Sequence, residues 1–458
     1  MFAVGIVLVF LFMIAVSLLS SRRVSGGSDF DSAGGKASSS VVAGAIIGTL
    51  VGGSSTVGTA QLAYHYGLSA WWFTLGGGIA CLILAVVYVK PFRRSGSKTL
   101  IGILSAEYGN TVGMTASLLS SVGTFLSIVS QIISATAVLA ILFPTMGSEA
   151  AILSAVLLMV LYVIFGGVLG AGVVGLFKTF LLYAAVIVSA VLVLMKTDGL
   201  SLLFDTLDRS TYFHLFARGV GTDGGACLSL ILGVLCTQSY AQAIFAGKTD
   251  REARKGALIS ACCIPPIGVG GILVGLYMRA CGPELQSAKL AFPRFIMDHL
   301  PPLAAGIVMA TLLIATLGTG AGLSLGISSV VYNDIAKRLL RKMPDQKGQL
   351  VFLRVIIVAV LLGAGVLCMM PIGDTILNFS FMSMGLRGAV LFIPLGCALW
   401  LRGRIRPLWI MLAMIISPLV ILVLGVTDLP VGDPLFAGVL VSMLFCALGF
   451  MAKKRPEC

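Results

Sequence analysis

The fold depends on the stretch Gly48-Thr-Leu-Val-Gly-Gly-Ser-Ser-Thr-Val-Gly58. It lies inside a long apolar segment, residues 40–64, yet it is rich in glycine and hydroxyl side chains. A helix interrupted in this way exposes backbone groups that lipid cannot satisfy. Two interpretations are open: close helix packing on small residues, or an unwound midpoint whose carbonyls and helix ends bind an ion and a solute.

The composition around this stretch excludes a water-soluble globular protein. Of the 458 residues, 58% are hydrophobic and 11% are charged, and the mean hydropathy is +1.06. Apolar runs near the roughly 20 residues that span a bilayer recur about thirteen times. They lie at residues 2–20, 40–64, 68–89, 113–143, 149–166, 168–195, 225–246, 257–280, 303–332, 351–371, 376–400, 408–426 and 434–452. These long, continuous runs exclude a β-barrel and predict an all-α polytopic membrane protein.

The net charge of +13 reflects membrane orientation rather than nucleic acid binding. With the N-terminus outside, the predicted inner loops hold most of the cationic side chains. The predicted outer loops hold only Lys196, Arg209, Arg218, Arg279, Lys289 and Arg294. This positive-inside asymmetry requires an odd number of spans, with Met1 outside and Cys458 in the cytoplasm. We expect an integral protein of the plasma (inner) membrane whose partners are lipid and a small-molecule solute, not nucleic acid; no oligomeric state follows.

A second, weaker interruption is Leu235-Cys236-Thr237-Gln238-Ser239-Tyr240-Ala241-Gln242, in the seventh apolar segment. It has amide, hydroxyl and phenol side chains but no glycine. Five segments separate the first break from the second, and five run from the second to about residue 401. A repeat with an odd number of spans must invert in the membrane, which is the plan of many secondary transporters.

Groups suited to covalent chemistry or metal binding are sparse. The histidines His65, His214 and His299 lie far apart in the sequence, and the cysteines show no CxxC spacing. We therefore expect no enzyme and no cofactor, with a coupling sodium ion as the one exception to consider. A membrane sensor or channel is a distant alternative, since a channel does not need two broken repeats.

Only two charged side chains fall near the middle of an apolar segment, Lys178 and Arg387, and both are positive. A lone cation there costs about 2.5–3.5 kcal/mol on insertion scales, so each should face a protein interior or a wet cavity. The Arg387 guanidinium suits a carboxylate or phosphate, which it can hold through two parallel hydrogen bonds. The alternative is that it caps backbone carbonyls in the core.

The chain resembles the sodium:solute symporter family, a group with the LeuT fold that includes the sodium/proline and sodium/galactose symporters. The resemblance rests on Gly52-Gly-Ser-Ser-Thr-Val-Gly-Thr-Ala-Gln-Leu-Ala-Tyr64, Thr237-Gln-Ser-Tyr-Ala-Gln242 and Ala315-Thr-Leu-Gly-Thr319. It implies two inverted five-helix repeats, flanked by one leading and two trailing helices. The implied parts are a leading helix and inner loop at 1–36, repeats at 37–196 and 225–401, an outer loop at 197–224, and trailing helices with a short inner tail at 402–458.

The resemblance also implies where solute and sodium bind. Solute would lie between the two broken helices, near Ser54, Ser55, Thr56, Thr237, Gln238 and Tyr240, to which we add Arg387 for its charge. Sodium would be held by carbonyls at positions matching Gly48, Val51 and Ala315, and by hydroxyls at positions matching residues 318 and 319. Here residue 318 is glycine, so only Thr319 can supply a side-chain oxygen.

A second departure concerns the family's Trp-Thr-Asp motif, which should fall near Val173-Val174-Gly175. Its carboxylate is absent, and one helical turn further, on the same face, stands Lys178. A lysine carries the same charge as sodium, and burial disfavours its charged form, so it could fill the ion site and exchange a proton. Some proton-coupled members of the wider LeuT-fold superfamily are similar, because they carry a lysine in this region of the equivalent helix. The alternatives are a structural ion pair or carbonyl contact, and snorkelling to the inner interface.

Together these features predict an alternating-access carrier, of the symporter type, for a small polar or anionic organic solute. The family implies sodium coupling. The residues favour sodium that is weakly required or dispensable, and a proton-coupled or ion-independent carrier is the alternative.

Overall fold

The computed structural model describes residues 1–9, 11, 37–97, 99–166, 171–332, 346–370, 375–426 and 433–452. Among these residues, nine helices are long and apolar enough to cross a membrane, or ten if the bent pair α13 (Val220–Leu235) and α14 (Gln238–Ala246) is one span. The predicted all-α class is confirmed. The predicted first span at 2–20 lies largely outside the described residues, and the total of thirteen stays a prediction.

The predicted break in the first repeat is confirmed at its centre. Helix α3 (Ser39–Leu50) ends before Val51, whose ψ of 104° is extended. A π-helical turn (Ser54–Gly58) then leads into α4 (Thr59–Tyr66). The other helices of this half are α5 (Trp72–Ile83), α6 (Val89–Arg94), α7 (Leu100–Tyr108), α8 (Asn110–Leu142), α9 (Ser148–Gly166) and α10 (Ala171–Lys196).

The second predicted interruption is also confirmed, because α13 and α14 meet at an angle of 46° around Cys236 and Thr237. The short helices α11 (Ser201–Thr206) and α12 (Arg209–Tyr212) precede this pair. After it come α15 (Asp250–Ala280), α16 (Ala291–His299), α17 (Pro302–Val330), α19 (Gln346–Met369), α20 (Ile376–Trp400), α21 (Pro407–Val426) and α22 (Pro434–Met451).

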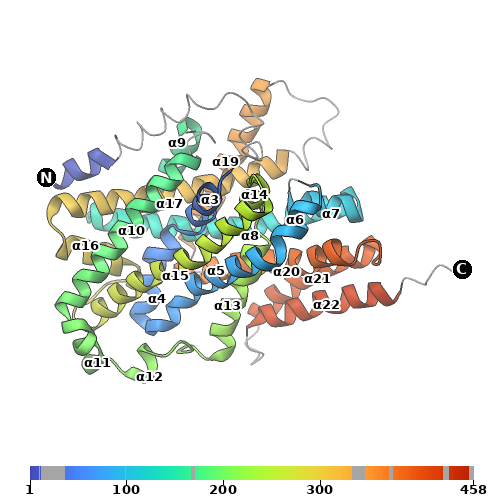
Figure 1. The fold of residues 1–458 in the computed structure, drawn as a ribbon. Coiled ribbons are helices and arrows are strands. Elements are labelled where there is room, and N and C mark those ends of the chain that lie inside the picture. The colour runs from blue at the N-terminus through green and yellow to red at the C-terminus, as the bar shows by residue number, and fades with distance from the viewer. Residues whose placement is uncertain are drawn as a thin grey trace, which may run out of the picture.

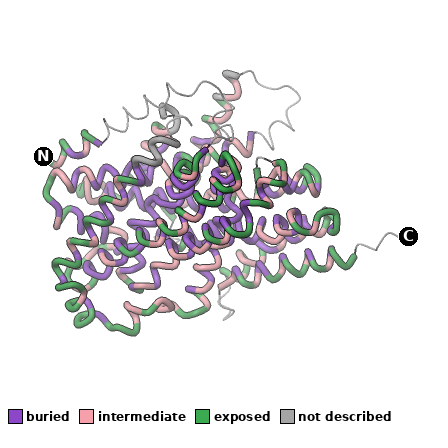
Figure 2. The backbone as a smooth tube through the Cα atoms, in the orientation of Figure 1, coloured by how far each residue is buried: buried purple, intermediate pink, exposed green. Residues whose placement is uncertain are grey.

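Burial separates a central set of helices from a lipid-facing set. In α8, α17 and α20, 72% of the most apolar window is buried inside the protein, against 22% in α19, 28% in α21 and 33% in α22. Figure 2 shows the buried residues gathered inside the bundle and the exposed ones on its outer faces. Helix α8 packs against both α17 and α20, so these helices form the centre of the molecule. The apolar faces of α19, α21 and α22 are suited to lipid.

At one end of the bundle, backbone contacts tie the two broken helices together. The Ala37 amide donates to the Ala246 carbonyl at 3.0 Å, and the Lys248 amide donates to the Ala37 carbonyl at 2.8 Å. Next to them, the Ser39 amide at the start of α3 donates to Glu252 Oε2 of α15 at 2.7 Å. The segments before α3 and after α14 are therefore held side by side.

The opposite end of the bundle has a buried ionic contact. Ser69, just after α4, donates to Asp223 Oδ1 of α13 at 2.7 Å, and Arg218 Nη2 lies 2.7 Å from the same oxygen. Asp223 is fully buried. Figure 1 shows α11, α12 and α16 at this end and α6 and α7 at the other. The two broken helices are thus connected at both ends.

Candidate functional site

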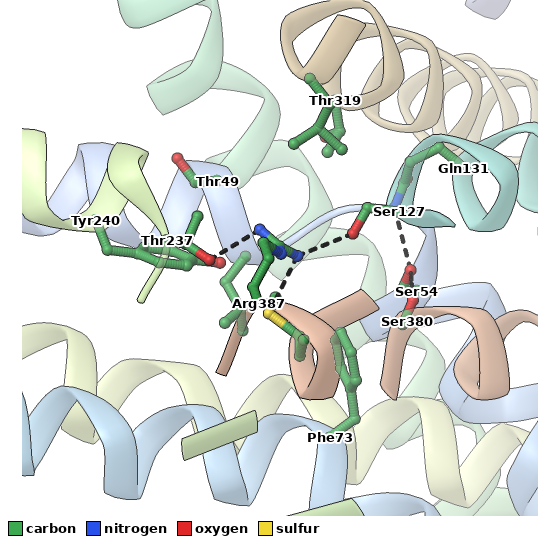
Figure 3. Close-up of a pocket in the computed structure, with 13 residues that line it drawn as sticks. Thr49, Ser54, Phe73, Ser127, Gln131, Thr237, Tyr240, Thr319, Ser380 and Arg387 are labelled. Atoms are coloured by element: carbon green, nitrogen blue, oxygen red, sulfur yellow. Dashed lines mark hydrogen bonds between the residues drawn. The ribbon is translucent and has the colours of Figure 1, made fainter. Parts of the chain in front are cut away.

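A small cavity lies where the break between α3 and α4 meets the α13–α14 bend (Figure 3). Its volume is about 30 Å³, enough for water-sized molecules but not for an organic solute. Solute binding would therefore require the lining helices to move apart. The lining residues are Thr49, Leu50, Ser54, Phe73, Ser127, Gln131, Thr237, Tyr240, Thr319, Leu323, Ser380, Met384 and Arg387.

Three serine hydroxyls from three elements meet beside the break. Ser54 Oγ lies 2.8 Å from both Ser130 Oγ of α8 and Ser380 Oγ of α20, and the latter two lie 2.7 Å apart. Gln131 joins them, because its Nε2 donates to Ser54 Oγ at 3.0 Å and its Oε1 accepts from the Gly53 amide at 3.2 Å. This network satisfies backbone and side-chain groups that would otherwise be costly in an apolar interior.

Some of the predicted solute residues face the backbone instead of the cavity. Ser55 Oγ accepts from the Gly52 amide at 3.0 Å and donates to the Gly52 carbonyl at 2.9 Å, and Thr56 Oγ1 donates to the same carbonyl at 3.0 Å. Gln238 Oε1 accepts from the Leu100 amide at the start of α7. Ser55 and Thr56 thus stabilise the break, and Gln238 anchors α7. The structure places Ser54, Thr237, Tyr240 and Arg387 at the cavity.

Arg387 reaches the cavity from α20, with only 3% of the residue exposed. Its Nη1 donates to Thr237 Oγ1 at 2.8 Å, and its Nη2 donates to Ser127 Oγ at 3.1 Å (Figure 3). Nη2 also donates to Ser383 Oγ at 2.8 Å. Its Nε donates to the Ser383 carbonyl at 3.1 Å. All these acceptors are neutral, and Arg387 forms no ion pair with a described residue.

Lys178 projects from α10 and is 6% exposed. Its Nζ donates to Thr319 Oγ1 of α17 at 2.9 Å, and that hydroxyl donates to the Ala315 carbonyl at 2.8 Å. A Cβ added to Gly52 would lie 3.0 Å from Thr319 Oγ1, so the break in the first repeat is adjacent. The structure therefore brings Lys178 to the predicted ion position. Snorkelling is excluded, because the ammonium is buried against Thr319.

The oxygens at this position do not suit sodium while Lys178 is charged. Two of the predicted sodium ligands, the Gly48 and Val51 carbonyls, lie at the end of α3, where the Gly52 amide donates to Ser55 Oγ. A third, Thr319 Oγ1, already accepts a hydrogen bond from the Lys178 ammonium, which would repel a second cation beside it.

The place of the missing hydroxyl at residue 318 is bordered by a tyrosine side chain. A Cβ added to Gly318 would meet the Tyr162 phenol oxygen at 3.3 Å, so the aromatic side chain of α9 takes the space beside this glycine. The side chains of residues 173–175 lie outside the described set, so the structure does not test what surrounds them. The described groups fit an ammonium better than a sodium ion.

Sequence reasoning missed the polar faces of α8 and α20. On α8, Ser127, Ser130, Gln131 and Ser134 follow the i, i+3, i+4, i+7 spacing of one helix face, and all are buried. On α20, Ser383 and Ser380 lie about one and two turns before Arg387. The available signal was this polar stripe in an apolar span, which predicts a face turned toward the bundle interior.

Comparison with known proteins identifies the family. The family model described as "Sodium:solute symporter family" matches residues 30–402, well over half of the chain. The chain belongs to this family. A curated relative, "Uncharacterized symporter YwcA" of Bacillus subtilis (strain 168), is 24% identical over 359 residues, which are 73% of this chain and 69% of that protein. This sodium:solute symporter family member is therefore an integral membrane transporter of the secondary symporter class, not an enzyme.

Solved structures show the same fold. A Na⁺-coupled sialic acid symporter in a substrate-bound, outward-open state has a TM-score of 0.76 at 17% identity, covering 98% of this chain and 96% of that chain. Mhp1, a nucleobase-cation-symport-1 family transporter, has a TM-score of 0.57 at 14% identity, covering 94% and 97%. The family member thus has the predicted LeuT-type architecture of two inverted repeats with leading and trailing helices.

Proposed function

We propose that this family member is an alternating-access carrier for a small polar, negatively charged organic solute, and that Lys178 takes the place of the coupling sodium ion. The observation that carries the proposal is the 2.9 Å hydrogen bond from Lys178 Nζ to Thr319 Oγ1. The proposal about the solute rests on the cavity between the two broken helices and on Arg387 in its lining.

The coupling follows from what the ammonium connects. Lys178 lies on α10 and Thr319 on α17, beside the Gly52 break, so a proton on Nζ adds a charged bridge between these helices. Loss of that proton removes both the positive charge and the strong charge-assisted bond. Protonation would therefore change the relative stability of conformations that keep or separate the two helices, and proton binding can be linked to solute binding.

Sodium coupling is the second candidate, favoured by family membership and by the position of Gly48 and Val51 at the end of α3. Against it stand Gly318, which supplies no side-chain oxygen, and Lys178, whose charge occupies the same region. The two candidates make opposite predictions for transport without sodium.

Uptake into proteoliposomes tests the proposal. A thermal-shift screen of small solutes first identifies a ligand, since binding raises apparent stability by mass action. We expect saturable uptake of that ligand in sodium-free choline buffer, and its loss in Lys178→Ala. Thr319→Ala should weaken uptake, because it removes the hydroxyl that holds the ammonium. Uptake that collapses without sodium while Lys178→Ala stays active would contradict the coupling. Unsaturated ion conductance would contradict a carrier.

We also propose the plasma (inner) membrane as the location, with the N-terminus outside and the C-terminus in the cytoplasm. The asymmetry of lysine and arginine between the loops supports this orientation. Cys281, just after α15, is exposed at the end where α16 lies. A membrane-impermeant maleimide should label it in intact cells, with Cys281→Ser as the control. Labelling of Cys281 only after permeabilisation would reverse the orientation.

A further inference from the structure

The cavity holds one cationic side chain and no anionic one. Of its lining residues, only Arg387 is charged, and the others are hydroxyl, amide, thioether, aromatic or aliphatic side chains. Lys178 is not part of the lining, but its ammonium donates to Thr319, which is. The described lining can thus balance one negative charge, and it holds no carboxylate to balance the charge of an ammonium group.

The groups that hold Arg387 are weak acceptors. The Thr237 hydroxyl donates its own hydrogen to the Gly233 carbonyl at 2.6 Å, and the Ser383 hydroxyl donates to the Gly123 carbonyl at 2.6 Å. Both oxygens therefore present lone pairs to the guanidinium. Such neutral contacts are about half as strong as a bond to a carboxylate, so an anion that enters the cavity can displace them.

One guanidinium nitrogen is best placed to change partner. Nη1 carries two hydrogens, and within the described residues only Thr237 accepts from it. Thr237 lies at the bend between α13 and α14. A carboxylate on Nη1 would release Thr237 and leave its hydroxyl bonded to its own helix, which links binding of an anion to the bend.

We infer that the solute is a short-chain monocarboxylate without an amino group, and that its carboxylate binds Arg387 in place of Thr237. This inference rests on the proposed carrier function and specifies its substrate class. The hydroxyl and amide groups of Ser54, Ser380 and Gln131 suit a hydroxy or oxo group on the solute. The side chains of Leu50, Phe73, Leu323 and Met384 supply an apolar wall for a short carbon chain.

This substrate class excludes three related kinds of solute: amino acids, dicarboxylates and neutral amides. An amino acid would bring an ammonium into a cavity with no acidic side chain and beside Arg387. A dicarboxylate would bring a second negative charge that the lining does not match. A neutral amide of the same shape would keep the size and lose the charge-assisted bond, which is worth about tenfold or more in affinity.

Four matched probes test the inference by thermal shift on the purified, full-length protein: lactate, lactamide, alanine and malate. We expect lactate to stabilise the wild-type protein at concentrations at least about tenfold below those at which the other three act. Lactamide equal to lactate would overturn the carboxylate. Alanine or malate equal to lactate would overturn the restriction to amine-free monocarboxylates. These outcomes need no variant to fold.

Variants then locate the carboxylate. Arg387→Gln should remove the preference of lactate over lactamide, while Arg387→Lys keeps part of it. Thr237→Val should keep lactate affinity or raise it, because the solute no longer displaces a hydroxyl. Arg254→Gln, an exposed cation, is the control for loss of charge. An unchanged preference of lactate over lactamide in folded Arg387→Gln would overturn the site.

Uptake separates failure of this inference from failure of the proposed function. Saturable uptake of a solute outside this class would refute the inference and leave the proposed carrier function intact, whereas absence of any saturable uptake would refute the carrier function.

Discussion

Ser130 contributes a hydroxyl to the polar network that joins α8, α20 and the first break. It contacts Ser54 Oγ at 2.8 Å and Ser380 Oγ at 2.7 Å, and it lies 3.1 Å from the Ile376 carbonyl. We expect Ser130→Ala to lower the free energy of unfolding by about 0.6–1.7 kcal/mol, the range for interhelical hydrogen bonds in membranes. Ser121→Ala is the matched control on the same helix, since among the described residues Ser121 bonds only to the Ser117 carbonyl. Equal melting temperatures in detergent for the two variants would contradict this role.

At the residue scale, charge was predictable and hydroxyl pairing was not. Lys178 and Arg387 stand out in the sequence because a charge within an apolar span must be compensated. Serine carries no such signal, because its hydroxyl can bond to its own helix, as Ser121 does, or bridge helices, as Ser130 does. Sequence reasoning also assigned Ser55 and Thr56 to the solute, whereas their hydroxyls hold the Gly52 backbone.

At the element scale, the backbone at the break between α3 and α4 packs closely against helices α8 and α17. A Cβ at Gly53 would lie 2.5 Å from Ser134 Cβ of α8 and 2.5 Å from Thr316 Cγ2 of α17. We expect Gly53→Ala to destabilise the protein by about 1–3 kcal/mol, as overpacking does. Gly322→Ala, on α17 with nothing within 4 Å, should be neutral or slightly stabilising. Fluorescence-detected size-exclusion profiles after heating would show the difference, and equal profiles would contradict the packing argument.

The hydrogen bonds and ion pairs at the two ends of the broken helices predict separate effects of mutation on local stability. Asp223→Asn removes the charge that pairs with Arg218 beside Ser69. Arg93→Gln removes the contacts of α6 with Asp250 and with the Gly247 carbonyl, both at 2.6 Å. Hydrogen exchange should rise near residues 213–223 in the first variant and near residues 244–252 in the second. Each variant serves as the control for the other end. A rise at both ends in either variant would contradict independent ties.

The elements show why part of the fold was readable in advance. The two interruptions were predicted because glycine, hydroxyl and amide side chains are concentrated there within apolar segments. The contacts that join the ends of the broken helices were not predicted. Ala37 and Gly247 come from different repeats, and their contact uses backbone atoms that no side-chain pattern marks.

At the scale of the whole molecule, the two broken helices are joined by contacts at both ends, and a cavity of about 30 Å³ lies between them. One buried cation, Arg387, lines that cavity, and a second, Lys178, donates to Thr319 beside the first break. Arg387 lies on the central helix α20, and Lys178 lies on α10 and bonds to the central helix α17, so we propose that movement of these helices is coupled to movement of charge. We propose that a proton on Lys178, rather than sodium, accompanies the solute.

The most direct test measures proton movement. Proteoliposomes that contain a pH-sensitive dye receive a pulse of the tightest-binding solute in sodium-free choline buffer, and protein-free liposomes give the background from passive permeation. We predict saturable internal acidification in the wild type, unchanged by adding sodium and absent from Lys178→Met. Acidification that appears only with sodium, or that persists in Lys178→Met, would contradict the account.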